Sequence, residues 1–286
     1  MAKYQDLNET AGMESLQNPL VSAEWLHANL SHPDLVMLDA SMQPELVDGV
    51  HYGIPGARHF DYDKKICDQK SPLPHMMPTA AEFEREVRAL GISDNSLIVI
   101  YDQQGVFASP RGWWMFKAMG HKSVAVLDGG LPAWKAMGFA VEPLVTSFVP
   151  GNFTAHAGEG FFCDADFVER IRNSAEFALM DARSEERFYG RASEPRPGLR
   201  GGHIPGSISL HYECVLEQGR MKSAEELQGG FAAKIKGHEK LVMSCGSGVT
   251  ACILALGATL AGYKEITIYD GSWSEWGLPS SGRPVE

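Results

Sequence analysis

The sequence Val36-Met37-Leu38-Asp39-Ala40 returns 142 residues later as Ala178-Leu179-Met180-Asp181-Ala182, and this repeat is the main evidence for the fold. Other landmarks repeat at offsets between 142 and 150: Val21–Leu26 with Cys163–Val168, Ile54–Gly56 with Ile204–Gly206, Thr79–Glu82 with Ser223–Glu226, Leu97–Tyr101 with Leu241–Ser244, and Val126–Gly129 with Ile268–Gly271. A nearly constant offset over this many landmarks indicates a duplicated domain rather than one larger α/β domain.

Each copy alternates short β-branched-rich strands with amphipathic helices, which predicts a mainly parallel sheet with helices on both faces. The fold class is therefore α/β with two tandem domains. Proline and glycine interrupt the periodicity between Phe139 and Gly160. We place a polar N-terminal tail at 1–20, the first domain at 21–140, a linker at 141–160 and the second domain at 161–286.

Composition excludes several classes of function. Lys plus Arg total 25 and Asp plus Glu total 36, for a net charge of -11, which argues against nucleic-acid binding and against anionic membranes. The uncharged stretch Leu241–Tyr263 contains four glycines, so we predict a buried strand, a loop and a buried helix rather than a membrane span. The first 19 residues lack an apolar signal segment, and we expect a cytoplasmic protein.

The cysteines and histidines show no metal-binding spacing. The five cysteines include no CxxC pair, and the ten histidines form no HxxxH motif with an acidic partner. We therefore expect no disulfide framework, no metal and no cofactor.

One cysteine stands out by its position. Cys245 directly follows a buried strand and opens a glycine-containing loop before a helix, and Asp102 occupies the same place in the first copy. A thiolate facing loop N–H groups and a helix N-terminus is stabilised as the anion, which makes it a nucleophile. Cys252 falls within the apolar helix and is interpreted as a core residue. We assign no role to Cys67, Cys163 or Cys214.

The loop Cys245–Ala251, with the sequence CGSGVTA, resembles the active-site loop of the rhodanese superfamily, and among its tandem-domain members that of the 3-mercaptopyruvate sulfurtransferases. Further matching stretches are Ser71–Met76, Pro110–Trp114, Glu194–Gly198, Gly202–Gly206 and Tyr269–Trp276. The resemblance implies an inactive first and an active second rhodanese-like domain. It also implies that Cys245 takes sulfur from 3-mercaptopyruvate as a persulfide, releases pyruvate, and passes the sulfur to thioredoxin, a small thiol or cyanide.

The resemblance also implies the remaining site residues. Arg187 and Arg196 would clamp the 2-oxo carboxylate, for which guanidinium groups are well suited. From the residues alone Arg183, Arg191 and Arg200 compete with them. Ser247, His75 and Asp63 would form a triad that supplies a proton to the departing enolate, with Asp61 an equal candidate beside Asp63. Gly246, Gly248, Val249 and Thr250 would complete the loop that binds the substrate.

Other functions remain as alternatives. A cysteine phosphatase would need an arginine six residues after the nucleophile, where this chain has Ala251. A thiosulfate:cyanide sulfurtransferase would share the persulfide, but Gly246 and Ser247 provide no charge for a dianionic donor. A non-catalytic sulfur carrier or binding module would not need Cys245 for turnover.

Overall fold

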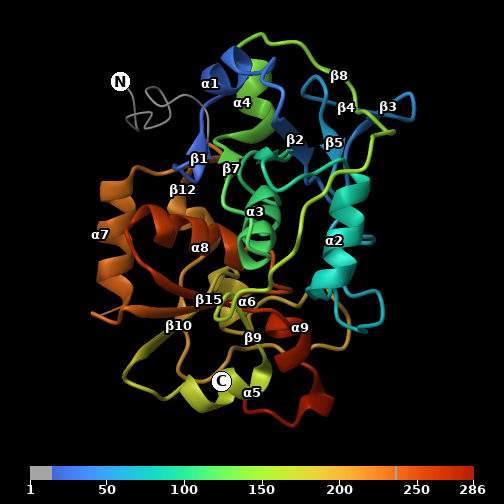
Figure 1. Cartoon of the computed structure of the whole chain (residues 1–286). Coiled ribbons are helices and arrows are strands. Elements are labelled where there is room, and N and C mark those ends of the chain that lie inside the picture. Colours follow the sequence, from blue (N-terminus) through green and yellow to red (C-terminus); the bar gives the residue numbers. More distant parts are fainter. Residues whose placement is uncertain (1–14, 236) are drawn as a thin grey trace. The chain divides into compact units, whose positions relative to one another are not determined.

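The computed structural model describes residues 15–235 and 237–286, so the predicted tail at 1–20 lies outside the described residues as far as position 14. The chain forms two compact units (Figure 1). The first contains the residues up to Gln69, Met77–Gly158 and Gln218–Met221. The second contains Lys70–Met76, Glu159–Glu217 and Lys222–Glu286. Each unit thus includes a short segment from the other half of the sequence, and the segment in the second unit carries His75.

The first unit is built on a parallel five-stranded sheet in the order β1-β7-β6-β2-β5. Its strands and helices are β1 (Leu20–Val21), α1 (Ala23–Ala28), β2 (Leu35–Asp39), β3 (Leu46–Val47), β4 (Val50–Gly53), β5 (Arg58–His59), α2 (Ala80–Ala89), β6 (Leu97–Tyr101), α3 (Ser109–Ala118), β7 (Val124–Leu127), α4 (Gly130–Ala136), β8 (Glu142–Pro143) and β13 (Arg220–Met221).

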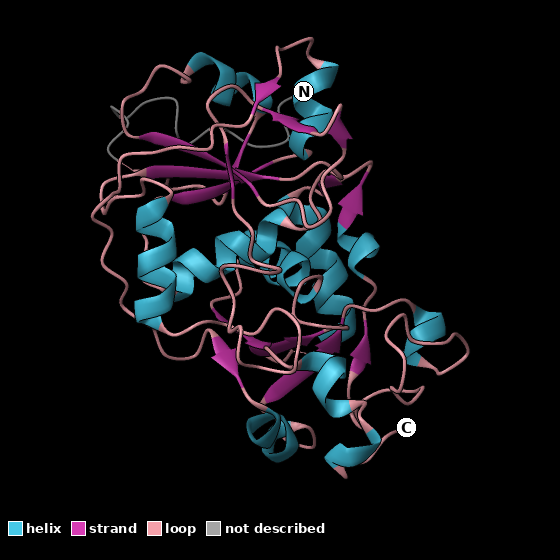
Figure 2. Ribbon diagram, turned by 90° about the vertical axis from the view of Figure 1, so that its right-hand side faces the viewer, coloured by secondary structure: helices cyan, strands magenta, loops and turns pink. Residues whose placement is uncertain are grey.

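Helices cover this sheet on both faces, as Figure 2 shows. One face packs against Trp25 of α1 and Trp134 of α4 through alternate strand residues such as Val99. The other is covered by α2 and α3, whose rings Phe83 and Phe116 meet edge to face at 5.1 Å. Central strands buried on both sides explain the continuous apolar runs in the sequence.

The second unit repeats the same architecture. Its sheet has the order β11-β10-β14-β15-β9, again all parallel, which is the order of the first sheet with each strand replaced by its repeat. Its elements are β9 (Phe162–Cys163), α5 (Ala165–Ile171), β10 (Phe177–Asp181), α6 (Glu185–Phe188), β11 (Ile208–Ser209), the 3-10 helix Tyr212–Val215, β12 (Leu216–Glu217), α7 (Ala224–Ile235), β14 (Lys240–Ser244), α8 (Ala251–Leu260), β15 (Glu265–Tyr269), α9 (Ser272–Trp276) and the 3-10 helix Pro279–Ser281. The predicted duplicated α/β fold is confirmed.

The uncharged stretch Leu241–Tyr263 forms β14, a loop and α8, as predicted. The α8 residues from Ala251 to Ala258 are all buried, and a helix that is apolar all round requires such a position. Among the described residues, no helix has the length and apolarity needed to cross a bilayer.

Helix starts follow the predicted capping signals. Thr79 and Glu82 form a reciprocal capping box at α2, and Ser223 and Glu226 make the matching hydrogen bonds before α7. Ser22 and Asp164 cap α1 and α5 through their side chains. Equivalent caps at equivalent places show that the duplication extends to local hydrogen bonding.

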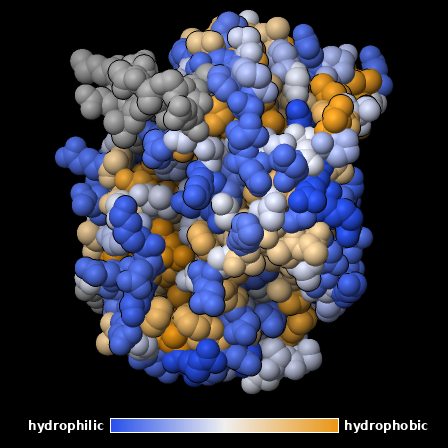
Figure 3. Space-filling model, viewed as in Figure 1, coloured by the Kyte–Doolittle hydropathy of each residue, from blue (hydrophilic) through white to orange (hydrophobic). Residues whose placement is uncertain are grey.

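The first unit carries one addition, the antiparallel sheet β3-β4-β8. The β3–β4 hairpin occupies the region that corresponds to α6 in the second unit. Its apolar residues Leu46, Val47 and Val50 are exposed and form an apolar area of the surface in Figure 3.

Candidate active site

The loop after β14 carries Cys245, and the loop after β6 carries Asp102 at the equivalent place. Both side chains are buried, with relative exposures of 2% for Cys245 and 1% for Asp102. Both loops lie at the carboxyl edge of a parallel sheet and lead into a helix, which is where ligands bind in this class of sheet. The two loops can therefore be compared atom by atom.

In the first unit the loop holds an anion of its own. The Oδ1 atom of Asp102 accepts a hydrogen bond from the N–H of Gln104 at 2.9 Å. Its Oδ2 accepts from the N–H groups of Phe107, Ala108 and Ser109 at 2.9–3.0 Å and from the Ser109 hydroxyl at 2.8 Å. Burial raises the pKa of Asp102, and these hydrogen bonds oppose that shift. The loop is thus an anion-binding nest, filled here by a carboxylate.

In the second unit the equivalent nest surrounds a sulfur. Counting 143 residues on from Asp102, Gln104, Phe107 and Ala108 reaches Cys245, Ser247, Thr250 and Ala251. Within the described residues, the N–H groups of Ser247, Thr250 and Ala251 donate to no protein acceptor. These donors, at the N-terminus of the ten-residue helix α8, remain available to an anion on Cys245.

The shape of the Cys245 loop is set by Ser272. This fully buried residue has φ 49°, a left-handed conformation that is unfavourable for a side chain with Cβ. Its Oγ accepts hydrogen bonds from the N–H groups of Cys245 and Gly248, both at 3.1 Å, and donates to the carbonyl of Tyr269 at 2.8 Å. In the first unit Gly130 occupies the equivalent position with φ 54°. Ser272 thus has an unfavourable backbone conformation, and its hydroxyl holds the Cys245 loop through these hydrogen bonds.

The next turn of α9 fixes the loop carbonyls. The Ser274 N–H and Oγ donate to the Gly246 carbonyl at 2.9 and 2.6 Å, and the Trp273 N–H donates to the Cys245 carbonyl at 3.0 Å. Gly248 has φ 75°, which explains why glycine is required there. Both carbonyls thus accept hydrogen bonds from α9, which restrains the backbone of the loop.

Arg187, on α6, lies next to this loop. A Cβ built on Gly246 would be 3.1 Å from its Nη2 and 3.9 Å from its Nη1, so the terminal edge of the guanidinium faces Gly246. The lateral edge is held by Glu194, whose carboxylate accepts from Nε at 3.2 Å and from Nη2 at 2.6 Å. One edge of Arg187 is thus anchored, and the other faces the residue that follows Cys245.

The structure distinguishes among the competing arginines. Arg183 is buried in bonds to Asp181, Glu194 and the Gly202 carbonyl. Arg200 donates to four main-chain carbonyls between residues 276 and 283. Arg191 is exposed and lies over Tyr189.

Arg196 differs from these three arginines. In the described part of the chain no hydrogen bond or ion pair engages the half-buried Arg196. Arg187, Arg191 and Arg196 thus retain donors for a ligand, and among these three Arg187 is the one that lies beside Gly246.

His75 lies against the loop within the second unit. It is buried, has φ 61°, and its Nδ1 is 3.0 Å from the Oγ and 3.3 Å from the carbonyl oxygen of Ser247. The imidazole is thus within hydrogen-bonding distance of the Ser247 hydroxyl, and the tautomer of His75 sets which of the two groups donates. The role of both residues in a triad stays a prediction.

Asp63 belongs to the first unit, where its carbonyl accepts a hydrogen bond from the Cys67 thiol at 3.5 Å. The neighbouring candidate Asp61 accepts through Oδ1 from the Lys64 N–H at 2.9 Å and belongs to the same unit. The role of an aspartate in a triad therefore stays a prediction.

The remaining loop residues have simpler roles. Val249 is 5% exposed, and Cys252 is fully buried with its thiol 3.2 Å from the Gly248 carbonyl, in keeping with a core residue. All five cysteines are free thiols, and the described residues contain no cluster suited to a metal ion.

The sequence alone did not indicate Ser272, Ser274 and Glu194 as residues of the site. Glu194 lies two residues before Arg196 in the chain, but only the fold shows that it holds Arg187. The signal for Ser272 was its alignment with Gly130 in the repeat. A serine at a turn position where the other copy has glycine indicates that the hydroxyl makes a specific hydrogen bond.

Comparison with known proteins agrees with this geometry. The family model described as "Rhodanese-like domain" matches residues 22–137 and 164–278. The chain is 40% identical to "Thiosulfate/3-mercaptopyruvate sulfurtransferase 1, mitochondrial" of Arabidopsis thaliana, over 92% of this chain and 76% of the relative. It is 39% identical to "3-mercaptopyruvate sulfurtransferase" of Rattus norvegicus, over 90% and 91%. The crystal structure of SseA from Escherichia coli, described as a 3-mercaptopyruvate sulfotransferase, superposes with a TM-score of 0.80 at 30% identity, covering 90% of this chain and all of that one.

Proposed function

This chain belongs to the rhodanese family, and from that premise we propose that it is a sulfurtransferase that takes sulfur from 3-mercaptopyruvate through a persulfide on Cys245. The observation that carries the proposal is the pair of loops. The first holds an anion in a nest of N–H groups, and the second offers the equivalent N–H groups to Cys245.

The comparison with Asp102 extends to the intermediate. In Asp102 the liganded oxygen is bonded to the atom that Cβ carries, and the outer sulfur of a cysteine persulfide is bonded in the same way to Sγ. The N–H groups of Ser247, Thr250 and Ala251 would therefore surround the outer sulfur and stabilise the persulfide anion. The Asp102 side chain in its loop therefore resembles the persulfide intermediate in the loop of Cys245.

The reaction has two steps. The Cys245 thiolate attacks the sulfur of 3-mercaptopyruvate, the carbon–sulfur bond breaks, and its electrons pass to the carbonyl as the enolate of pyruvate, which takes a proton. An acceptor thiolate then attacks the outer sulfur, leaving as a new persulfide and returning Cys245 as the thiolate. A small thiol, thioredoxin or cyanide would serve as acceptor.

Charge placement favours this donor over thiosulfate. Gly246 brings no charge into the loop, and the cation next to it is the terminal edge of Arg187. A planar carboxylate can accept two parallel hydrogen bonds from such an edge. Arg196 would supply the second cation, and Ser247, whose Oγ lies 3.0 Å from Nδ1 of His75, would direct its hydroxyl hydrogen towards the enolate. Five free thiols fit a reducing compartment such as the cytoplasm.

The test compares initial rates with 3-mercaptopyruvate and with thiosulfate at equal concentration, using one thiol acceptor. Mass spectrometry of the enzyme mixed with donor alone should show one added sulfur atom on the peptide that contains Cys245. Cys245→Ser should lose both signals, and Cys252→Ser, at the buried cysteine of α8, is the matched control that keeps them. A preference for thiosulfate would keep the persulfide and overturn the donor. No turnover with either would leave a carrier or binding module.

A further inference from the structure

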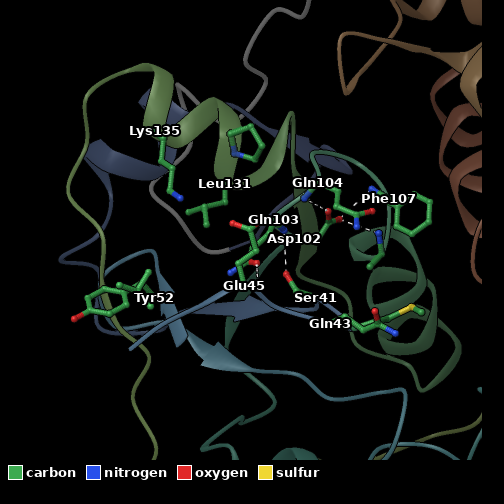
Figure 4. Close-up of a pocket in the computed structure, with 14 residues that line it drawn as sticks. Ser41, Gln43, Glu45, Tyr52, Asp102, Gln103, Gln104, Phe107, Leu131 and Lys135 are labelled. Carbon is green, nitrogen blue, oxygen red and sulfur yellow. Dashed lines mark hydrogen bonds between the residues drawn. The ribbon is translucent and has the colours of Figure 1, made fainter. Parts of the chain in front are cut away.

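The first unit contains a pocket of about 580 Å³ at the carboxyl edge of its sheet (Figure 4). It opens beside the Asp102 loop, where the second unit has its cysteine. Its volume lies within the range of about 300–1,000 Å³ that is usual for small-molecule sites. The inactive copy has therefore kept a binding-sized space at the place where this fold binds ligands.

One charged residue that lines this pocket has the opposite sign to its counterpart in the second copy. Arg187 stands six residues after Asp181, the last residue of β10, and Glu45 stands six residues after Asp39, the last residue of β2. In the sequence, a carboxylate thus stands where the second copy has the guanidinium of Arg187. The pocket is unsuited to the anionic 2-oxo acid that the second unit is proposed to bind.

The nest beside the pocket is also closed to an external anion. The carboxylate of Asp102 already occupies the N–H groups of Gln104, Phe107, Ala108 and Ser109. An anionic ligand would therefore need another cation in the pocket wall.

That cation is Lys135, which extends from α4 towards Leu131 and Gln103 in Figure 4. Lys135 and Glu45 are both exposed, and within the described residues neither side chain makes an ion pair. Two hydrogen bonds hold Gln103 in place. Its side-chain Oε1 accepts from the main-chain N–H of Glu45 at 2.7 Å, and its main-chain N–H donates to the Ser41 Oγ at 3.0 Å. The Gln103 amide N–H groups are left as further donors.

The rest of the wall combines apolar surface with amide groups. Val47, Phe107 and Leu131 contribute the apolar part, and Gln43 and Gln104 contribute amides. A ligand that suits the whole wall carries one positive group, one negative group and an apolar part, with no net charge.

We propose that this pocket binds a small zwitterion, a free α-amino acid with an apolar side chain. Its ammonium group pairs with Glu45, its carboxylate with Lys135 and the Gln103 amide, and its side chain packs against Leu131. The site lies entirely within the first unit and does not depend on the sulfur chemistry of the second.

The experiment is isothermal titration of the full chain with L-leucine, with L-methionine and L-phenylalanine as probes of side-chain size. The charge requirement is tested with 4-methylpentanoate, which lacks the ammonium, and with 3-methylbutylamine, which lacks the carboxylate. Each charged group of the zwitterion makes one ion pair with an exposed side chain. Each analogue should therefore bind at least about fivefold more weakly than L-leucine.

Variants locate the site. Glu45→Gln and Lys135→Met should each weaken L-leucine binding by about fivefold, the first leaving 4-methylpentanoate and the second 3-methylbutylamine unaffected. Glu24→Gln and Lys122→Met are matched controls at exposed positions outside the pocket and should bind normally. Sulfur transfer by the Glu45 and Lys135 variants should be unchanged, which verifies folding.

Three results would overturn the proposal. These are no saturable binding of any of the three amino acids, binding that neither Glu45→Gln nor Lys135→Met alters, and binding that Cys245→Ser abolishes. The last would place the ligand in the catalytic loop, and a failure of sulfur transfer with amino-acid binding intact would refute only the proposed function.

Discussion

Replacing Glu194 by glutamine would test how Arg187 is positioned. The Glu194 carboxylate is 3% exposed and lies between two guanidinium groups, Arg183 at 2.9 Å and Arg187 at 2.6 Å. With Asp181 paired to Arg183 at 2.7 Å, the cluster carries two negative and two positive charges. Glu194→Gln leaves it with one uncompensated positive charge and places an amide donor opposite a guanidinium donor.

The magnitude follows from these contacts. A hydrogen bond to a charged group contributes about 1.5–3 kcal/mol, and removing one partner of a buried pair costs about 3–5 kcal/mol. Arg183 keeps Asp181, and Arg187 is 24% exposed, so water replaces part of the loss. We expect the free energy of unfolding to fall by about 2–4 kcal/mol. Because Arg187 is no longer held towards Gly246, kcat/KM for 3-mercaptopyruvate should fall about 10–100-fold.

Urea unfolding and steady-state kinetics at a temperature where the variant is folded would measure the two effects. Glu186→Gln is the matched control. Glu186 lies on α6 with Arg187, its side chain is 62% exposed, and its Oε1 is 3.9 Å from Nη1 of Arg191. It should change neither quantity appreciably. The double variant Arg187→Ala/Glu194→Gln should have nearly the same kcat/KM as Arg187→Ala alone, because Glu194 affects catalysis through Arg187. A folded Glu194→Gln enzyme within twofold of wild-type kcat/KM, or fully additive effects of the two substitutions on kcat/KM, would show that Glu194 does not position Arg187.

Three further predictions concern the two loops. Gly246→Ala should lower kcat/KM about 5–20-fold because its Cβ meets Arg187 at 3.1 Å, whereas Gly229→Ala, with open space, should be neutral; equal effects would contradict this. Ser272→Ala should destabilise more than Ser272→Gly in thermal unfolding, by about 1 kcal/mol, because both lose the hydroxyl but only glycine relieves φ 49°; the reverse order would exclude strain. Burial raises the pKa of Asp102, so the folded chain holds that proton more tightly than the unfolded chain. The stability of wild type relative to Asp102→Ala should therefore decrease as pH rises above about 4 in urea unfolding, and an increase would mean that the loop hydrogen bonds dominate.

The fold was predictable because its determinants are local and occur twice. Apolar strands such as Val36–Ala40, capping boxes such as Thr79–Glu82, and the uncharged run that became β14 and α8 are each specified by neighbouring residues. The duplication then checks every local inference against a second copy. Cys245 was identified for the same reason, since a strand, a glycine loop and a helix are consecutive in the chain.

Tertiary structure decided which polar side chains are already occupied. Arg183, Arg187 and Arg196 are alike in sequence, but the carboxylates that hold the first two and leave the third without a partner among the described residues are brought there by folding. His75 reaches Ser247 across 172 residues, and Ser272 reaches Cys245 across 27. A hydrogen bond depends on distances of about 3 Å between atoms, and no local pattern encodes such distances between remote residues. The sequence therefore determined the scaffold and the nucleophile, and packing determined which charges remain free to bind a substrate.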